Sequence, residues 1–265
     1  MELRRLVRGR LPWSRLEAVV AHLAERYDRE TAHVRFLDAD NWLSTPMVLD
    51  DELFVKVISR QNSLVHAVLT TGRNLGAFSS GTEGFFEHFG TPYQMAQHEL
   101  EATEKMRDLG INAPEPIEAL EFDGLGIVVM EFLPEFESLE ALDRSREEAL
   151  APKLFENLRM LHDNGLAHGD LRAENVLILD DELYFIDATG VNPDATEDAR
   201  AYDLACALGA LEPLIGARAT VDSALTAYTT DDLLSATEFL DFVNIRPDHD
   251  FAAASVKGEI EKRAT

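Results

Sequence analysis

The sequence of 265 residues lacks the features that mark secreted, membrane-spanning or zinc-binding proteins. Its single cysteine, Cys206, excludes an internal disulfide framework and is typical of a reducing cytoplasm. No apolar run is long enough to cross a bilayer, the first residues lack the apolar core of a signal peptide, and no group of His and Cys has zinc-site spacing. We therefore expect a cytoplasmic protein without membrane contact, whose 46% hydrophobic residues suffice for one large core or two smaller ones.

Positive charge is also scarce. The chain has 24 Lys and Arg against 49 Asp and Glu, which gives a formal net charge of -25. This surplus argues against broad binding to phosphate backbones, because such binding needs clustered cations. An acidic surface is either ordinary solvation or an adaptation to a salt-rich cytoplasm, where screening weakens self-repulsion. The even spread of the acids along the chain favours a halophilic protein.

The first fifteen residues are the exception to this acidity. Five arginines make them basic: Arg4, Arg5, Arg8, Arg10 and Arg15. A cluster of this kind is either an exposed helix face or a contact for RNA or another anion, and the sequence leaves both interpretations open.

The hydrophobic pattern divides the chain into a short helix, a strand-rich part and a helical part. Residues 13–28 repeat apolar groups at helical spacing, and the tail over 204–265 does so as well. Three strand-like stretches separated by turn-forming clusters predict an antiparallel meander, at residues 32–37, 42–49 and 52–59. Residues 59–90 are rich in glycine and small polar residues and predict a long insertion.

A helix is predicted to begin at Pro92. Thr91 and Gln94 have the spacing of a capping box, with proline at the first helical position. Gly110 marks its end, because glycine readily adopts the left-handed conformation that follows a helix.

One carboxylate, Glu99, lies within the apolar stripe of this helix, whereas Glu101 lies off that face. An unpaired buried carboxylate is costly, so Glu99 needs a cation. The candidate is Lys56, among apolar neighbours in LFVKVI. A lone lysine in such a strand is more simply a side chain that extends to solvent. Two isolated charges in separate apolar elements instead favour an ion pair.

Three oxygen-bearing side chains stand at the ends of apolar runs in HGDLRAENVLILDDELYFIDATG, residues 168–190. Asp170 lies in a turn-like segment, Asn175 follows it, and Asp187 ends the run LYFI. Strand ends deliver polar groups to a shared edge, so we expect the three to converge on one cleft. Carboxylate and amide oxygens are ligands that Mg²⁺ prefers.

Taken in order, these motifs resemble the RIO family of atypical protein kinases. HGDLRAEN matches the kinase catalytic loop, YFIDATG resembles the metal-binding aspartate segment, and GIVVMEFL resembles the strand that enters the hinge. The resemblance spans roughly residues 33–205, and we expect a source in a halophilic archaeon. It implies an α+β, two-lobed protein-kinase-like fold, with a small antiparallel-sheet N-lobe containing one key helix and a mostly helical C-lobe. The expected divisions are a helical extension over 1–30, an N-lobe over 31–133 with the insertion at 59–90, and a C-lobe over 134–265.

The resemblance implies binding of ATP and Mg²⁺. Lys56, held by Glu99, would neutralise the inner phosphates, as the lysine–glutamate pair of protein kinases does. Asn175 and Asp187 would hold the metal. The backbone of residues 131–133 would meet the adenine edge, with the side chain of Met130 beside the pocket. The expected adenine-binding residues are therefore Met130, Glu131 and Leu133.

The resemblance also assigns the catalytic groups. Asp170 would accept the hydroxyl proton of the acceptor or orient it. Arg172 would either stabilise charge near the transferring phosphate or pair with Glu174 at the surface. We expect His168 to brace the loop by hydrogen bonding and Asp203 to tie the loop to the next helix. The family also implies a protein or ribosomal acceptor, which the sequence does not name.

The turn that should cover the phosphates departs from protein kinases. LDADNWLS, residues 37–44, has no glycine and two aspartates, although close approach of backbone to phosphate needs glycine. Three functions therefore remain. The best supported is a RIO-like serine/threonine protein kinase or ATPase. The alternatives are a small-molecule phosphotransferase of the aminoglycoside or choline kinase sort, and a nucleotide-binding pseudokinase that serves as a scaffold.

Overall fold

The computed structural model describes residues 11–37, 44–59, 90–188, 196–245 and 250–264. These residues form two compact units. The first unit contains residues 11–37, 44–59, 90–104 and 114–134, and the second contains the remainder. The predicted insertion and most of the glycine-free turn lie outside the described residues, as do four of the five N-terminal arginines.

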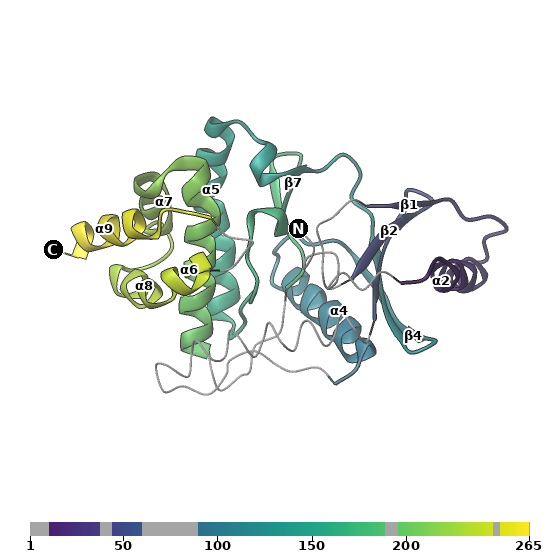
Figure 1. The fold of residues 1–265 in the computed structure, drawn as a ribbon. Coiled ribbons are helices and arrows are strands. Elements are labelled where there is room, and N and C mark those ends of the chain that lie inside the picture. The colour runs from purple at the N-terminus through teal and green to yellow at the C-terminus, as the bar shows by residue number, and fades with distance from the viewer. Residues whose placement is uncertain (1–10, 38–43, 60–89, 189–195, 246–249, 265) are drawn as a thin grey trace. The chain divides into compact units, whose positions relative to one another are not determined.

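A five-stranded antiparallel sheet forms the centre of the first unit, in the order β1-β2-β3-β5-β4 (Figure 1). Its strands are β1 (Val34–Phe36), β2 (Thr45–Leu49), β3 (Leu53–Ile58), β4 (Pro116–Phe122) and β5 (Leu125–Glu131). The turn between β2 and β3 has two left-handed aspartates, Asp50 and Asp51, as a tight hairpin requires. The meander predicted for the first three strands is confirmed.

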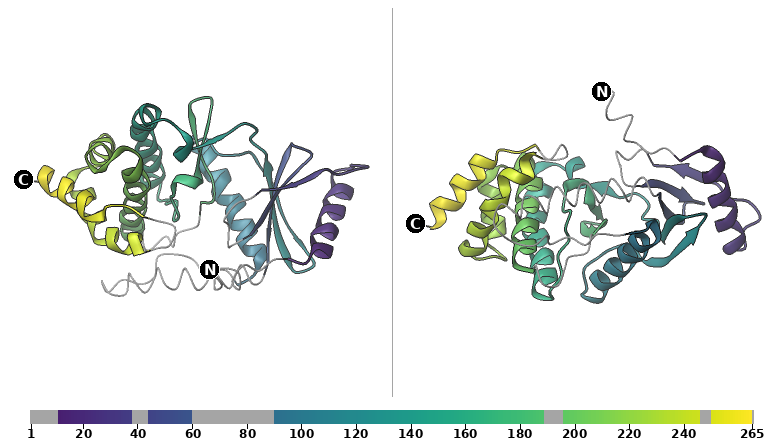
Figure 2. Two further views of the ribbon diagram at one scale, coloured as in Figure 1. Left: turned by 45° about the horizontal axis from the view of Figure 1, so that its top comes forward. Right: turned by 60° about the horizontal axis from the view of Figure 1, so that its bottom comes forward.

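Helices cover both faces of this sheet (Figures 1 and 2). On one face, Val19 and Leu23 of α2 (Trp13–Arg26) pack against β3 and β5. On the other, Ala96 of α4 (Pro92–Asp108) packs against Ile58 and Val128. Because both faces are covered, β3 and β5 are almost continuously apolar. A lysine in β3 therefore enters a buried environment.

The start of α4 is fixed by the capping box and by one glycine. The amide of Gln94 donates to Oγ1 of Thr91, and the amide of Thr91 donates to Oε1 of Gln94, each at 3.1 Å. A Cβ on Gly126 of β5 would lie 2.0 Å from the carbonyl oxygen of Pro92, so only glycine allows this approach. The predicted helix start is confirmed, and it sets the position of Glu99 two turns later.

Ion pairs attach α2 to the edge of the sheet. Arg15 Nε donates to Oδ2 of Asp123 at 3.0 Å, so the one described N-terminal arginine has an intrachain partner. Arg26 donates to both carboxylate oxygens of Glu118, at 2.7 and 2.6 Å, and the hydroxyl of Tyr27 donates to Oε1 at 2.6 Å. These bonds, that of Arg26 above all, lower the pKa of Glu118. We call Arg26, Tyr27 and Glu118 the α2–β4 clamp.

The α2–β4 clamp predicts a pH-dependent contribution to stability. The pKa of Glu118 is lower in the folded protein than in the unfolded chain, where it is about 4.3. The stabilisation by Glu118 is therefore fully present above the unfolded pKa and is lost as the pH falls through the folded pKa. We expect Glu118→Gln to reduce the free energy of unfolding by about 1 to 3 kcal/mol near neutral pH. Urea unfolding at several pH values should show this deficit shrinking in acid.

The matched control is Glu121→Gln, which removes the same charge from an exposed position on β4. Loss of one negative charge relieves self-repulsion equally in both variants, so their difference reports the clamp. Equal unfolding free energies for the two variants at neutral pH would contradict the clamp.

The second unit consists mainly of helices, as predicted for the C-terminal part. They are α5 (Arg144–Asp163), α6 (Thr196–Ile215), α7 (Ala217–Ala224), α8 (Thr230–Ile245) and α9 (Ala253–Ala264). Residues 201–211 of α6 are all buried, and α6 packs against α5, α7 and α8 (Figure 2). A small sheet, β6 (Glu137–Ser138), β7 (Val176–Leu179) and β8 (Glu182–Phe185), completes the unit. Among the described helices, none has the length and apolar character needed to span a membrane.

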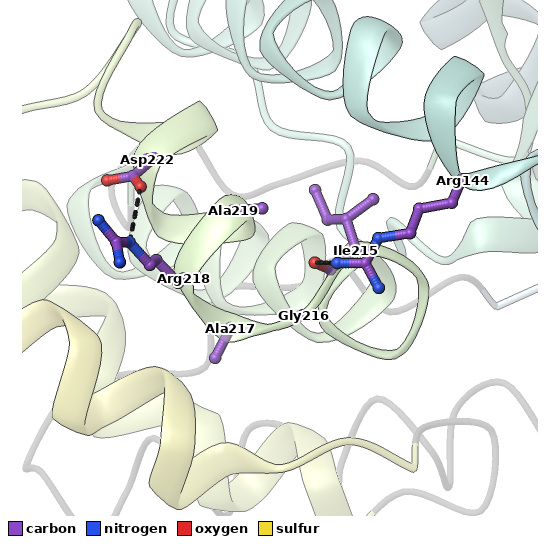
Figure 3. A pocket seen from close by; sticks show the side chains of 7 residues that line it. All are labelled: Arg144, Ile215, Gly216, Ala217, Arg218, Ala219 and Asp222. Atoms are coloured by element: carbon purple, nitrogen blue, oxygen red, sulfur yellow. Dashed lines mark hydrogen bonds and ion pairs between the residues drawn. The ribbon is translucent and has the colours of Figure 1, made fainter.

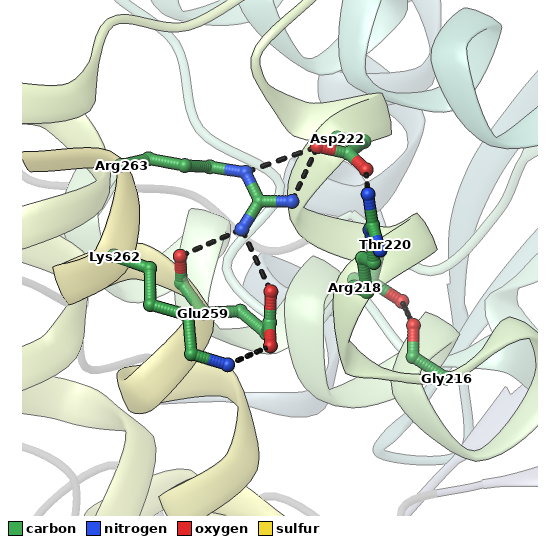
Figure 4. Close-up of polar contacts among 7 residues, drawn as sticks. All are labelled: Gly216, Arg218, Thr220, Asp222, Glu259, Lys262 and Arg263. Atoms are coloured by element: carbon green, nitrogen blue, oxygen red, sulfur yellow. Dashed lines mark hydrogen bonds and ion pairs between the residues drawn. The ribbon is translucent and has the colours of Figure 1, made fainter.

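The last helix is attached to α7 by a group of ion pairs (Figure 4). Arg263 Nε donates to Oδ1 of Asp222 at 3.0 Å, and its Nη1 donates to Oε2 of Glu259 at 2.9 Å. Hydrogen bonds from Arg263 and then Lys262 lower the pKa of Glu259 to about 2. The carboxylate of Glu259 therefore stays ionised through the neutral and mildly acidic range, where it holds Arg263 of the same helix beside Asp222 of α7.

Candidate active site

In the first unit, Lys56 and Glu99 form the predicted ion pair. Nζ of Lys56 on β3 lies 2.9 Å from Oε1 of Glu99 on α4, and the two residues are only 6% and 9% exposed. Glu101, on the same helix, is exposed, as expected. The pair is confirmed by the geometry, and its physical basis is the cost of leaving either charge alone in an apolar interior.

Two backbone amides at the end of β5 are already bonded within the chain. Met130 is buried among the residues that pack on α4. The amide of Glu131 donates to the carbonyl of Glu115, and the amide of Phe132 donates to the carbonyl of Glu52, both at 2.9 Å. Within the described part of the chain, no acceptor faces the amide of Leu133. Among the amides of residues 131–133, that of Leu133 is therefore available for a ligand, and the expected contact of this backbone with adenine stays a prediction.

In the second unit, a buried aspartate of α6 holds the loop that begins HGD. Asp203 is fully buried, and its carboxylate accepts from the amide of His168 at 2.5 Å and from the amide of Gly169 at 2.7 Å. The ring of His168 is completely buried, and this burial lowers its pKa, so the ring is neutral. Both expected supports of the loop are confirmed, because Asp203 holds two amides and Nδ1 of His168 accepts from the amide of Asp170 at 3.4 Å.

Asp170 and Asn175 lie together in this loop. Nδ2 of Asn175 donates to the carbonyl of Asp170 at 2.8 Å. The hairpin of β7 and β8 then brings the third residue close, because the amide of Ile186, next to Asp187, donates to the carbonyl of Asn175 at 3.1 Å. Asp187 has a φ of 59°, a left-handed conformation that aspartate tolerates better than most residues. The chain therefore gathers the loop and the segment of Asp187 within one unit.

Arg172 lies between two carboxylates. Its Nε is 3.2 Å from Oδ2 of Asp170, and its Nη1 forms an ion pair with Oε1 of Glu174. The pairing with Glu174 is thus confirmed, and the guanidinium also contacts the predicted base, whereas a role for Arg172 near the transferring phosphate stays a prediction. Asp170 itself is only 6% exposed.

The side-chain oxygens of Asn175 and Asp187 are of the kind that would hold a magnesium ion together with the phosphate oxygens of a nucleotide. Because the amide nitrogen of Asn175 is engaged by Asp170, the amide oxygen is left as the acceptor. In the described ranges, no three His, Cys, Asp or Glu side chains form a metal cluster. Mg²⁺ typically takes one or two carboxylates and completes its shell with water and phosphate oxygens. Asn175 and Asp187 match that requirement, whereas a dedicated all-protein metal cage is absent from the described residues.

The sequence did not indicate two further residues behind this loop, His162 and Tyr228. Nε2 of His162 lies 3.3 Å from Oδ2 of Asp203, and the hydroxyl of Tyr228 lies 2.8 Å from Nδ1 of His162. His162 stands in the apolar run before the HGD motif, which was a usable signal. Nothing in the local sequence distinguishes Tyr228, because it reaches the site only through the packing of helices.

A separate pocket of about 440 Å³ contains none of the predicted site residues (Figure 3). It is lined by Arg144, Ile215, Gly216, Ala217, Arg218, Ala219 and Asp222. Arg144 donates to the carbonyl of Ile215 at 2.6 Å, and Arg218 lies 3.8 Å from Asp222. Both arginines are thus engaged within the chain, and we assign the pocket no function.

Comparison with known proteins agrees with the kinase-like arrangement. Residues 89–202 match the RIO domain family. Choline kinase LicA from Streptococcus pneumoniae is 12% identical, with a TM-score of 0.52 over 94% of this chain and 92% of that one. A choline/ethanolamine kinase family protein from Mesorhizobium loti is 11% identical, with a TM-score of 0.51 over 93% and 92%. The GDP complex of wild-type aminoglycoside 2'-phosphotransferase-IIIa is 11% identical, with a TM-score of 0.52 over 92% and 97%.

No curated protein matches the chain in sequence. The structural similarities, at these low identities, establish the fold. The expected α+β, protein-kinase-like fold, with an antiparallel-sheet lobe and a helical lobe, is confirmed. Together with the match to the RIO domain, this fold supports a phosphotransferase.

Proposed function

We propose that the protein is an ATP- and magnesium-dependent phosphotransferase of the RIO type. It transfers the γ-phosphoryl group of ATP to a serine or threonine hydroxyl, or to water. The observation that carries the proposal is the loop in which Asp203 holds the backbone before Asp170 while Asn175 is bonded to Asp170. A loop held in this way presents a base and a metal ligand in fixed geometry, which is what phosphoryl transfer demands.

The first unit would bind the nucleotide. Lys56 supplies a positive charge to the inner phosphates, and Glu99 keeps its ammonium group in place. The amide of Leu133 donates to the adenine edge, with the backbone of Glu131 and the side chain of Met130 beside the ring. In the absence of glycine in residues 37–44, this lysine and the metal carry most of the phosphate binding.

The second unit would carry the chemistry. Asn175 and Asp187 hold Mg²⁺, which neutralises phosphate charge when it is bound. Asp170 accepts the proton of the acceptor hydroxyl or orients that hydroxyl. Arg172 already contacts Asp170, and its guanidinium would turn toward the phosphoryl group as charge builds there.

The proposed function is tested by a turnover screen. The purified protein is incubated with ATP and Mg²⁺ against protein, ribosomal and small-molecule acceptors. The assay is run at high salt because we propose that the acidic surplus is a halophilic adaptation. Metal-dependent phosphorylation of a protein or ribosomal acceptor, or ATP hydrolysis, is the expected result. Metal-dependent ATP binding without turnover would instead identify a pseudokinase scaffold.

A small-molecule phosphotransferase is the second candidate. It is favoured by the structures that share this fold over most of their length, which are described as choline kinases and aminoglycoside phosphotransferases. The acidic chain would attract cationic acceptors of this chemistry. Turnover that depends on an aminoglycoside or an amino alcohol, without any protein substrate, would select this candidate over the first.

A further inference from the structure

A buried network behind the catalytic loop ends at Tyr228, to which the proposed function assigns no role. Tyr228 lies between α7 and α8 and is 7% exposed. Its ring packs edge-on against Phe155, with centroids 6.4 Å apart, and the guanidinium of Arg159 lies 5.6 Å from the ring centroid. These contacts fix the ring, so its hydroxyl points to one partner, Nδ1 of His162 at 2.8 Å.

His162 connects Tyr228 to Asp203. His162 is 1% exposed, and its Nε2 faces a carboxylate oxygen of Asp203 at 3.3 Å. A neutral imidazole has one donor and one acceptor, and a carboxylate can only accept. In the neutral form of His162, Nε2 therefore carries the proton, and Nδ1 accepts from Tyr228. Burial, followed by the charge of Asp203, raises the pKa of Tyr228, so the phenol keeps the proton that it donates.

Asp203 in turn holds the backbone that carries Asp170. Its two oxygens accept from the amides of His168 and Gly169. Gly169 has a φ of 80°, a conformation that other residues rarely adopt, so this turn depends on its hydrogen bonds. A rotation of the Asp203 carboxylate would therefore displace the residue before Asp170.

We propose that Tyr228 is a positioning residue for phosphoryl transfer, acting through His162 and Asp203 on the backbone of the catalytic loop. The proposal rests on the proposed function of Asp170. Without the hydroxyl, Nδ1 of His162 loses its donor in a buried site, and the second neutral tautomer becomes accessible. The ring then no longer fixes Asp203, and small errors in the position of a catalytic group cost turnover.

The test is Tyr228→Phe, which keeps the ring and its contacts with Phe155 and Arg159. We expect kcat to fall about tenfold while the KM for ATP stays within about twofold. The ¹⁵N chemical shifts of the His162 ring should no longer be those of the tautomer protonated at Nε2. The amide chemical shifts of His168 and Gly169 should change as well. The control is Tyr27→Phe, which removes a hydroxyl bonded to a carboxylate in the first unit and should leave kcat unchanged.

A double-mutant cycle separates positioning from general destabilisation. If Tyr228 acts through His162, adding Tyr228→Phe to His162→Gln should change kcat by less than about twofold. The reason is that His162→Gln alone already breaks the connection between Tyr228 and Asp203. Additive losses, a parental kcat in Tyr228→Phe, or unchanged His162 and amide signals would overturn the proposal. A parent protein without any turnover would refute the proposed function, and the NMR signals would then decide alone whether Tyr228 holds the loop.

Discussion

Replacing Asp170 by alanine is expected to lower turnover by about 10²- to 10⁴-fold with little change in nucleotide affinity. A base or orienting group acts mainly in the transition state, so its loss leaves ground-state binding intact. Asp187→Ala should have the opposite signature. It should abolish metal-dependent nucleotide binding, because the bridging cation would lose its charged ligand.

Both variants are measured for ATP affinity, with and without Mg²⁺, and for turnover. The matched control is Glu156→Ala, which removes one carboxylate from an exposed position on α5. Its affinity and turnover should equal those of the parent. If Asp170→Ala turns over as fast as the parent, the kinase interpretation of the HGD loop fails. Parental Mg²⁺-dependent affinity in Asp187→Ala would remove Asp187 from the metal site.

Replacing Glu99 by alanine is expected to destabilise the first unit by about 3 to 5 kcal/mol, because it leaves the buried ammonium of Lys56 without a counter-charge. The double variant Lys56→Met with Glu99→Leu should recover most of that loss, since apolar residues of similar volume tolerate this environment. It should nevertheless bind ATP weakly, because the proposed phosphate cation is gone. Urea unfolding and ATP titration measure the two effects separately.

The control for the ion pair is Glu101→Ala, on the exposed side of the same helix. Surface charges of this kind contribute roughly 0 to 1 kcal/mol, so its unfolding curve should lie close to that of the parent. Equal stabilities of Glu99→Ala and Glu101→Ala would show that Lys56 is not desolvated in solution. Full recovery of ATP affinity in the double variant would exclude Lys56 from phosphate binding.

Local signals in the sequence were sufficient for the elements that begin and end at recognisable residues. The capping box of Thr91 and Gln94 and the left-handed glycine after α4 are properties of a few consecutive residues, so they can be read without the fold. The Lys56–Glu99 pair was also predictable, although its members are distant in sequence. The cost of burying either charge alone is large enough to require a partner.

Residues whose role depends on packing could not be predicted in this way. Along α4, Ala96 and Thr103 are buried whereas Met95 and Ala102 are only partly buried, because the contact of Pro92 with Gly126 sets the rotation of the helix. The sequence also did not show that the carbonyls of Glu115, before β4, and Glu52, before β3, occupy the amides of Glu131 and Phe132.

The sequence by itself determined most helices and strands and the buried ion pair, through hydrophobic period and burial cost, and the resemblance of its ordered motifs implied the kinase-like fold and the groups proposed for catalysis. The resemblance implied that Asp203 holds the HGD loop, but only the tertiary structure showed His162 and Tyr228 behind Asp203. Asp203, His162 and Tyr228 come from α6, α5 and the turn after α7, and each hydrogen bond between them joins segments that only helix packing brings within 3.3 Å. Hydrogen bonds act over such short distances and need specific angles, so no pattern along the chain encodes them.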